Sequence, residues 1–402
     1  MRDNRRNEIK GDNMIILQPD YYDEFKCIGS KCSYTCCSGG WRIFIDKKTF
    51  NKYRRVKGAF GKELNESVIK NQNCNNKNEY AEMACRNDGT CSMLNEDNLC
   101  KIYINCGEGM LSRTCAIYPR ISNKFTETVF ERNLELSCPV IAEYLINHRE
   151  PFAFVAKEEE LNNEDKWGMI KWEGEKIEYA YEIGSKIREL FIDIIQTKNV
   201  SISKKLMILK AADKKINSDC LEEIDEDLQR IRKYIENELD VSRIMISQNI
   251  TYISKIICDI MDNTVDFMSN DIRKYIVEIL EVLLEYEENN SLSIEEDNNQ
   301  FYEYFNDRIY VLENFIVYNL YSDFGEFLME LDVEKYTDIT IIKYVLIKLA
   351  FFSIYKKNKN IDNEEIRNIF VIFERYYKGD RIKKIICDLI EIKKYKIAAI
   401  IN

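Results

Sequence analysis

The chain carries fourteen cysteines, and eleven of them lie between Cys27 and Cys138. The stretch CIGSKCSYTCCSGGW places four thiols within eleven positions, two of them adjacent. A second group follows with longer, uneven gaps. Thiols at this density can form disulfides, hold a soft metal or an iron–sulfur cluster, or attack a substrate. The eight cysteines of the two groups are Cys27, Cys32, Cys36, Cys37, Cys91, Cys100, Cys115 and Cys138.

Metal binding is the interpretation that this spacing favours. The first residues, MRDNRRNEIKGDNMIIL, contain no apolar run of signal-peptide length, so we expect a cytoplasmic protein whose thiols stay reduced rather than forming disulfides. Zinc sites built from four cysteines usually contain C-x2-C turns, and the chain has none. Thiolates that come from several loops suit a [4Fe-4S] cluster, with zinc as the runner-up.

Composition excludes several other functions. The single histidine, His148, rules out a Cys/His zinc finger and a two-histidine metalloprotease site. Residues 1–150 hold 23 lysines and arginines against 20 acidic residues, which leaves 35 against 49 for residues 151–402. Such an acidic chain repels phosphate, so we expect no nucleic-acid partner. No run of about 18 apolar residues is present, so we expect no membrane span.

Three ordered blocks carry a resemblance to a known family. They read PDYYDEFKCIGSKCSYTCCSGGWRIFIDKKTFNKY, TCSMLNEDNLCKIYINCGEGMLSRTCAIYPR and ERNLELSCPVIAEYL, and a further block, VLENFIVYNLYSDFGEF, lies in the second half of the chain. The chain resembles the flagellin lysine-N-methylase family. The resemblance implies a cytosolic enzyme that transfers a methyl group from S-adenosylmethionine to lysine side chains of flagellin and carries an iron–sulfur cluster. It also implies that the eight cysteines of the two groups are the family's cysteines.

Lysine methylation needs a neutral amine, because the ammonium has no free electron pair. A tyrosine or a carboxylate could take the proton, and an arginine could bind the carboxylate of the methyl donor. The candidates are Tyr118 and Glu131 as catalytic groups, and Arg120, Arg132 and Trp41 as cofactor-binding groups. Each has a structural alternative. The YPR segment could be a rigid turn, Glu131 and Arg132 an ion pair, and Trp41 a core residue.

The elements that must position these residues are predicted to be mainly α-helical. We expect a flexible leader (1–13), a cysteine-rich metal-binding domain (14–150), a junction (151–175) and an irregular all-helical bundle (176–402). Within the second segment, Asp46 is expected to cap a helix and Pro139 to lie in the first turn of another. A non-catalytic metal-binding or electron-transfer module, with a helical domain that docks a partner, is the alternative function.

Overall fold

The computed structural model describes residues 14–38, 42–71, 76–174, 176–216, 221–237, 250–289, 294–378, 380–393 and 397–401. Contacts divide the chain into two units. The N-terminal unit comprises Met1–Val140 and Ala153–Glu173, and the helical unit comprises Ile141–Phe152 and Gly174–Asn402. The predicted leader and Trp41 lie outside the described residues.

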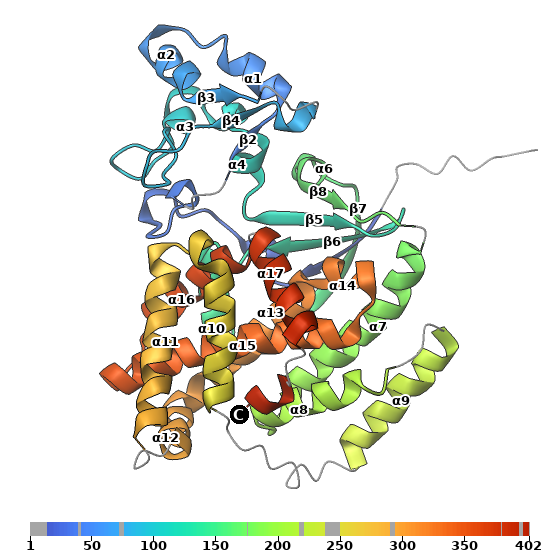
Figure 1. Cartoon of the computed structure of the whole chain (residues 1–402). Helices are drawn as coiled ribbons and strands as arrows, with labels where there is room; N and C mark the ends of the chain where they lie inside the picture. The colour runs from blue at the N-terminus through green and yellow to red at the C-terminus, as the bar shows by residue number, and fades with distance from the viewer. Residues whose placement is uncertain are drawn as a thin grey trace, which may run out of the picture. The chain divides into compact units, whose positions relative to one another are not determined.

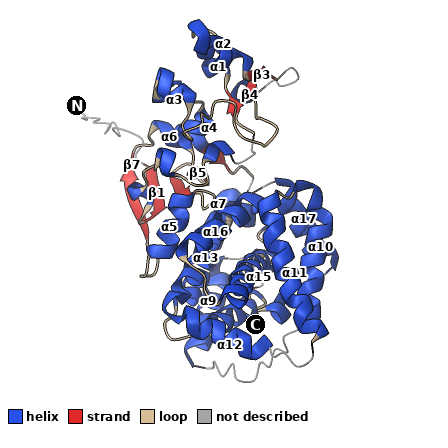
Figure 2. Cartoon of the chain, turned by 90° about the vertical axis from the view of Figure 1, so that its left-hand side faces the viewer, coloured by secondary structure: helices blue, strands red, loops and turns tan. Residues whose placement is uncertain are grey.

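A five-stranded mixed sheet forms one part of the N-terminal unit, with the strand order β7-β1-β6-β5-β8 (Figures 1 and 2). Strand β1 pairs in parallel with β6, where Ile16 lies opposite Phe130, and in antiparallel fashion with β7. Strand β5 pairs with β6 antiparallel and with β8 parallel. The strands are β1 (Met14–Pro19), β5 (Arg120–Lys124), β6 (Val129–Leu134), β7 (Phe154–Glu159) and β8 (Met169–Lys171).

The prediction of a mainly helical chain is confirmed, but it included no five-stranded sheet. Strand β6 shows why the sheet was missed. Its sequence is VFERNL, and Phe130 to Leu134 are buried without interruption. Three of these buried residues are polar, so the strand shows no alternation of apolar and polar side chains. The segment 151–175, predicted as a junction, contains β7, the helix α6 (Asn163–Gly168) and β8.

A second, smaller framework in the N-terminal unit carries five of the eight predicted cysteines. Its three-stranded sheet has the order β2-β4-β3. Asp46 caps α1 by accepting hydrogen bonds from the backbone N–H groups of Lys48 and Thr49, as expected. The elements are β2 (Phe44–Ile45), β3 (Val68–Lys70), β4 (Ala81–Met83), α1 (Lys47–Tyr53), α2 (Gly58–Glu66), α3 (Lys101–Cys106) and α4 (Arg113–Ile117). Ile45, Tyr53 and Leu64 form the buried core that holds them together.

All strands of the described chain belong to the N-terminal unit, and the other unit is helical (Figure 2). Helix α15 is buried along most of its length and contacts α8, α11, α13, α16 and α17 (Figure 1). The helices are α5 (Pro139–Asn147), α7 (Ile177–Gln196), α8 (Ile202–Asp213), α9 (Leu221–Asn237), α10 (Ile250–Thr264), α11 (Asn270–Glu288), α12 (Ile294–Phe305), α13 (Ile309–Ser322), α14 (Phe324–Glu330), α15 (Val333–Asn358), α16 (Asn363–Tyr377) and α17 (Asp380–Lys393).

Two sequence predictions bear on these helices. Pro139 is the first residue of α5, as its fixed φ angle suggested. None of the helices in the described parts of the chain combines the length and the apolar character that a membrane crossing requires.

Candidate functional site

Five of the eight predicted cysteines gather in the smaller framework of the N-terminal unit. Cys91 is part of its buried core, Cys37, Cys100 and Cys115 pack against that core, and Cys36 shares a hydrogen bond with Cys37. We call Cys36, Cys37, Cys91, Cys100 and Cys115 the thiol cluster. Although these residues span 80 positions of the sequence, the fold brings them close enough to influence one another's ionisation.

Short backbone and capping contacts position the thiol cluster. Cys36 and Cys37 lie on a 3-10 turn, and the backbone N–H of Cys91 donates to the carbonyl oxygen of Cys37 at 2.7 Å. Cys100 is the residue that precedes α3. Cys115 lies in α4, where its N–H donates to the Oγ of Ser112 at 3.3 Å. Four separate segments therefore deliver the five thiols.

The surroundings of the thiol cluster disfavour charge on its sulfur atoms. Burial raises the pKa of Cys91 to about 11, and burial together with neighbouring thiols raises the pKa of Cys115 to about 12. The hydrogen bond with Cys36, followed by burial, raises the pKa of Cys37 further. Such thiols become thiolates when a bound cation compensates the charge. Burial of this kind disfavours a reactive, solvent-exposed nucleophile.

The other three predicted cysteines lie elsewhere in the N-terminal unit. Cys27 is exposed and its Sγ accepts a hydrogen bond from the N–H of Gly29 at 3.4 Å. Cys32 is half-buried at the end of a 3-10 turn, and Cys138 is buried just before α5. Within the described ranges, no three His, Cys, Asp or Glu side chains are grouped so that they could hold a metal ion. Metal ligation by the eight cysteines thus stays a prediction.

The YPR segment joins α4 to β5. The Tyr118 hydroxyl lies 3.1 Å from the Oγ of Ser137, which in turn donates to the carboxylate of Glu135 at 3.0 Å. Because the Ser137 proton points to Glu135, Tyr118 is the donor in the first of these hydrogen bonds. The guanidinium of Arg120 lies over the ring of Phe25, 5.0 Å from its centroid. Both sequence-predicted residues are half-buried.

Glu131 and Arg132 follow one another on β6, so they point to opposite faces of the sheet. Both are buried, with 2% and 4% of their surfaces exposed. Arg132 does not pair with its neighbour. Its guanidinium forms two hydrogen bonds with Asp165, at 2.8 and 2.7 Å, and others with Gln18 and Glu159. Its role in cofactor binding stays a prediction.

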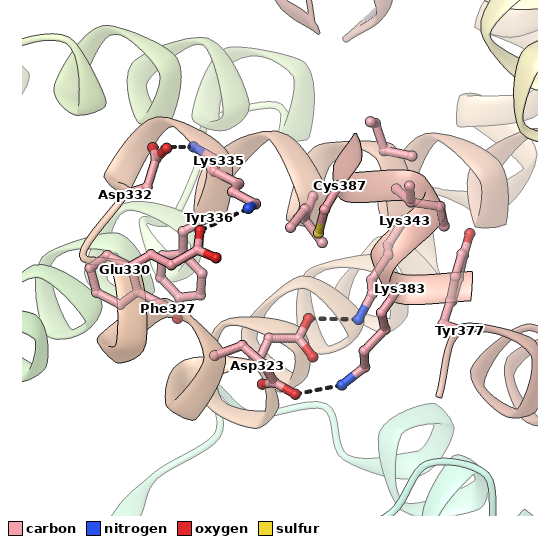
Figure 3. A pocket seen from close by; sticks show the side chains of 14 residues that line it. Asp323, Phe327, Glu330, Asp332, Lys335, Tyr336, Lys343, Tyr377, Lys383 and Cys387 are labelled. Carbon is pink, nitrogen blue, oxygen red and sulfur yellow. Dashed lines mark hydrogen bonds and ion pairs between the residues drawn. The ribbon is translucent and has the colours of Figure 1, made fainter. Parts of the chain in front are cut away.

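A pocket in the helical unit supplies charged residues that the sequence predictions missed (Figure 3). It is a cavity of about 190 Å³ between α14, α15 and α17. Apolar side chains form much of its wall, and three lysines each reach a carboxylate. The lining residues are Asp323, Glu326, Phe327, Glu330, Asp332, Lys335, Tyr336, Ile339, Ile342, Lys343, Tyr377, Lys383, Ile386 and Cys387. We call this the charged pocket.

The sequence contained one signal for the charged pocket. The block VLENFIVYNLYSDFGEF, which carried part of the family resemblance, ends on α14, and Asp323 and Phe327 belong to it. Asn319, from the same block, is buried and accepts a hydrogen bond from Lys343 Nζ at 3.0 Å. Lys343 also lies 2.6 Å from Asp323 Oδ2. Burial would raise the pKa of Asp323, but the charges of Lys343 and its neighbouring lysines hold it below its usual range.

Together the fold and the two sites define a class of two-unit protein, with a thiol cluster on a small α/β framework and a charged pocket in an all-helical body. Residues 188–397 match the family model described as the FliB lysine N-methylase C-terminal domain. This match covers more than half of the chain, which therefore belongs to the FliB lysine N-methylase family. The resemblance seen in the sequence is confirmed.

Individual relatives cover a smaller part of the chain. The chain is 31% identical over 145 residues to the flagellar biosynthetic protein FliU of Salmonella muenchen. This matched segment covers 36% of this chain and 84% of FliU. It is 30% identical over 145 residues to the lysine-N-methylase of Salmonella typhimurium, covering 36% of this chain and 35% of that enzyme. The matched segment thus spans about a third of the length of that lysine-N-methylase. No solved structure matches the chain.

Proposed function

We propose that the protein is a lysine N-methyltransferase that uses S-adenosylmethionine to methylate lysine side chains of flagellin. Membership of the FliB lysine N-methylase family is the observation that carries this proposal. The relatives named lysine-N-methylase support the reaction, and the relative named a flagellar biosynthetic protein supports a flagellar substrate. We expect the protein to act in the cytosol, where its many thiols stay reduced.

The reaction balances without an oxidant or a reductant. The acceptor ammonium first loses a proton to a base. The free electron pair of the amine nitrogen then forms a bond to the methyl carbon, while the carbon–sulfur bond breaks and its electron pair stays on sulfur. Tyr118 is our candidate for the proton transfer, because its hydroxyl is linked through Ser137 to the carboxylate of Glu135. The buried carboxylate of Glu131 is the second candidate.

A [4Fe-4S] cluster is the cofactor that we propose for the N-terminal unit, with zinc as the runner-up. The thiol cluster supplies five of the eight candidate ligands, and four thiolates suffice for such a cluster. When bound, the cluster would supply positive charge that stabilises buried thiolates and would link the four segments that deliver them. A single zinc ion needs all its ligands about 2.3 Å from one point. The wider spacing of ligands on an iron–sulfur cluster suits thiols from separate segments better.

The proposal is tested by incubating the anaerobically reconstituted protein with flagellin and methyl-labelled S-adenosylmethionine. We expect label on lysine, located by peptide mass spectrometry. Absence of label, with intact cluster absorbance, would contradict the enzyme and favour the metal-binding or electron-transfer module. Metal analysis of the anaerobically purified protein separates about four irons per chain, expected for one [4Fe-4S] cluster, from one zinc.

A further inference from the structure

The charged pocket combines an apolar interior with a charged mouth. Inside, the rings of Phe327 and Tyr336 stack with their centroids 4.4 Å apart and their planes within 8° (Figure 3). Ile339, Ile342 and Ile386 add aliphatic surface to the lining. Such an interior binds the hydrocarbon part of a ligand because burial removes apolar surface from water.

The exposed side chains at the mouth of the charged pocket are mainly acidic. Lys343 is buried and pairs with Asp323, so these two charges cancel. Lys383 pairs with Glu326 at 2.6 Å, and Lys335 pairs with Glu330 at 2.7 Å. Asp332 and Glu391 add further carboxylates, the first in the lining and the second on Lys335. The lining itself holds four carboxylates and three lysines. Glu330 and Glu326 are more exposed than the lysines that pair with them, and this exposed negative charge favours a cationic ligand.

The size of the charged pocket limits what it can hold. Pockets for whole cofactors and drug-sized ligands usually measure about 300–1,000 Å³. This cavity measures about 190 Å³. That volume accommodates a single long side chain rather than an entire nucleoside cofactor. A lysine side chain matches the pocket in three respects, since it has an aliphatic stem, a terminal cation and the right size.

We propose that the charged pocket is a docking subsite for a lysine side chain of the protein substrate. The inference rests on the proposed function, because that function supplies a protein substrate recognised through lysine. The stem lies against Phe327 and Tyr336, and the ammonium meets the exposed carboxylates of Glu326 and Glu330. The subsite contributes to substrate binding and takes no part in methyl transfer.

Cys387 offers a direct readout, because its half-buried thiol lines the charged pocket. The full-length protein is alkylated with N-ethylmaleimide, with and without N-acetyl-lysine methylamide, and Cys387 is followed by peptide mass spectrometry. When the concentration of N-acetyl-lysine methylamide is ten times its Kd, alkylation of Cys387 should be about tenfold slower, because a bound ligand lowers the rate by the factor 1 + [L]/Kd. Cys258, exposed on α10 away from the pocket lining, is the control whose rate should not change.

Two further probes decide between occupants. N-acetyl-norleucine methylamide has the stem without the ammonium and should protect Cys387 more weakly than the lysine probe. S-adenosylhomocysteine should not protect it. Protection by S-adenosylhomocysteine but not by the lysine probe would overturn the proposal and assign the pocket to the methyl donor. Protection of Cys387 by none of the three probes would also overturn it. These outcomes do not depend on turnover, so they are separable from a failure of the proposed function.

Substitutions provide a second test. The change Glu330→Gln should raise the KM for flagellin about two- to fivefold with kcat unchanged, because an exposed charge pair contributes up to about 1 kcal/mol. The change Cys387→Phe, which fills the cavity, should raise it further. Glu281→Gln, at an exposed position of α11 outside the pocket, is the matched control and should leave KM unchanged. An unchanged KM in both pocket variants would refute the subsite.

Discussion

Arg132 and Asp165 form a bidentate ion pair that links α6 to β6. The Nε and Nη2 groups of the arginine donate to Oδ1 and Oδ2 of the aspartate at 2.8 and 2.7 Å. Asp165 also accepts hydrogen bonds from the Ser122 hydroxyl and the Asn162 backbone N–H. Burial alone would raise the pKa of Asp165, but Arg132 holds it below its usual range. The pair is therefore charged, buried and hydrogen-bonded on both sides, and it is a structural centre of the N-terminal unit.

Replacing Arg132 with methionine should destabilise the N-terminal unit by about 3–5 kcal/mol, because it leaves the carboxylate of Asp165 buried without its partner. Tryptophan fluorescence measures this unit selectively, since all three tryptophans of the chain, Trp41, Trp167 and Trp172, belong to the N-terminal unit. The fluorescence transition in urea should move to lower concentration, while the far-UV circular dichroism of the helical unit changes little.

Arg55→Met, at an exposed arginine of the same unit, is the control and should change stability by less than about 0.5 kcal/mol. If Arg132 served chiefly to bind the methyl donor, a different result would follow. Arg132→Met would then leave the fluorescence transition in place and raise only the KM for S-adenosylmethionine.

The thiol cluster predicts which cysteines are required for metal. Cys91→Ala and Cys115→Ala should each lower the iron content of the reconstituted protein well below about four atoms per chain, because each removes one of the proposed ligands of the thiol cluster. Cys258→Ala, in the helical unit, should retain iron like the wild type. Iron analysis and visible absorbance are the measurements. Full iron content in both cluster variants would show that the ligands lie elsewhere among the eight cysteines.

The helical unit should have a pH-dependent stability that originates at Asp338. Burial raises the pKa of Asp338 to about 6, and the nearby carboxylates of Asp213 and Glu334 contribute, although Lys210 opposes the shift. A carboxyl group with a raised pKa binds more protons in the folded than in the unfolded state. Its contribution to stability is therefore complete below about pH 4 and is lost as the pH rises to about 6.

Asp338→Asn removes this titration, and Lys210, which pairs with Asp338, keeps Asp213 as a second ion-pair partner. Between pH 4 and pH 6, the free energy of unfolding of the wild type should fall relative to that of the variant by up to about 3 kcal/mol. This figure follows from a pKa shift of about two units at about 1.36 kcal/mol per unit. Urea unfolding followed by far-UV circular dichroism at several pH values measures it. A difference that stays constant over this range would show that Asp338 titrates normally.

Gly184 sets how closely α7 can approach α14. A methyl group at this position would clash with the side chain of Leu328 and lie 3.2 Å from Phe327. Gly184→Ala should destabilise the helical unit by about 1–3 kcal/mol through overpacking, despite the higher helix propensity of alanine. Gly174→Ala is the control, because no atom lies within 4 Å of the added methyl group. A more stable Gly184→Ala protein by circular dichroism would show that α14 moves freely.

Local patterns predicted the parts of the fold that depend on neighbouring residues. Asp46 precedes a helix because its carboxylate can accept hydrogen bonds from the backbone N–H groups two and three residues later. Pro139 begins a helix because the first helical residue does not need a backbone N–H. The all-helical second region followed from apolar residues at helical spacing. The five-stranded sheet did not follow, since β6 buries Glu131, Arg132 and Asn133 side by side with apolar residues.

The sequence by itself determined the helical character of the second unit, the presence of a thiol-rich region and the family to which the chain belongs. Only the tertiary structure decided which thiols come together, because packing rather than local spacing brings residues as distant as Cys36 and Cys115 close enough to influence each other's ionisation. It also decided that Arg132 pairs with Asp165 rather than with Glu131. The charged pocket likewise required three helices that are separated in the chain. Long-range pairing of this kind depends on how elements pack, which one sequence does not display.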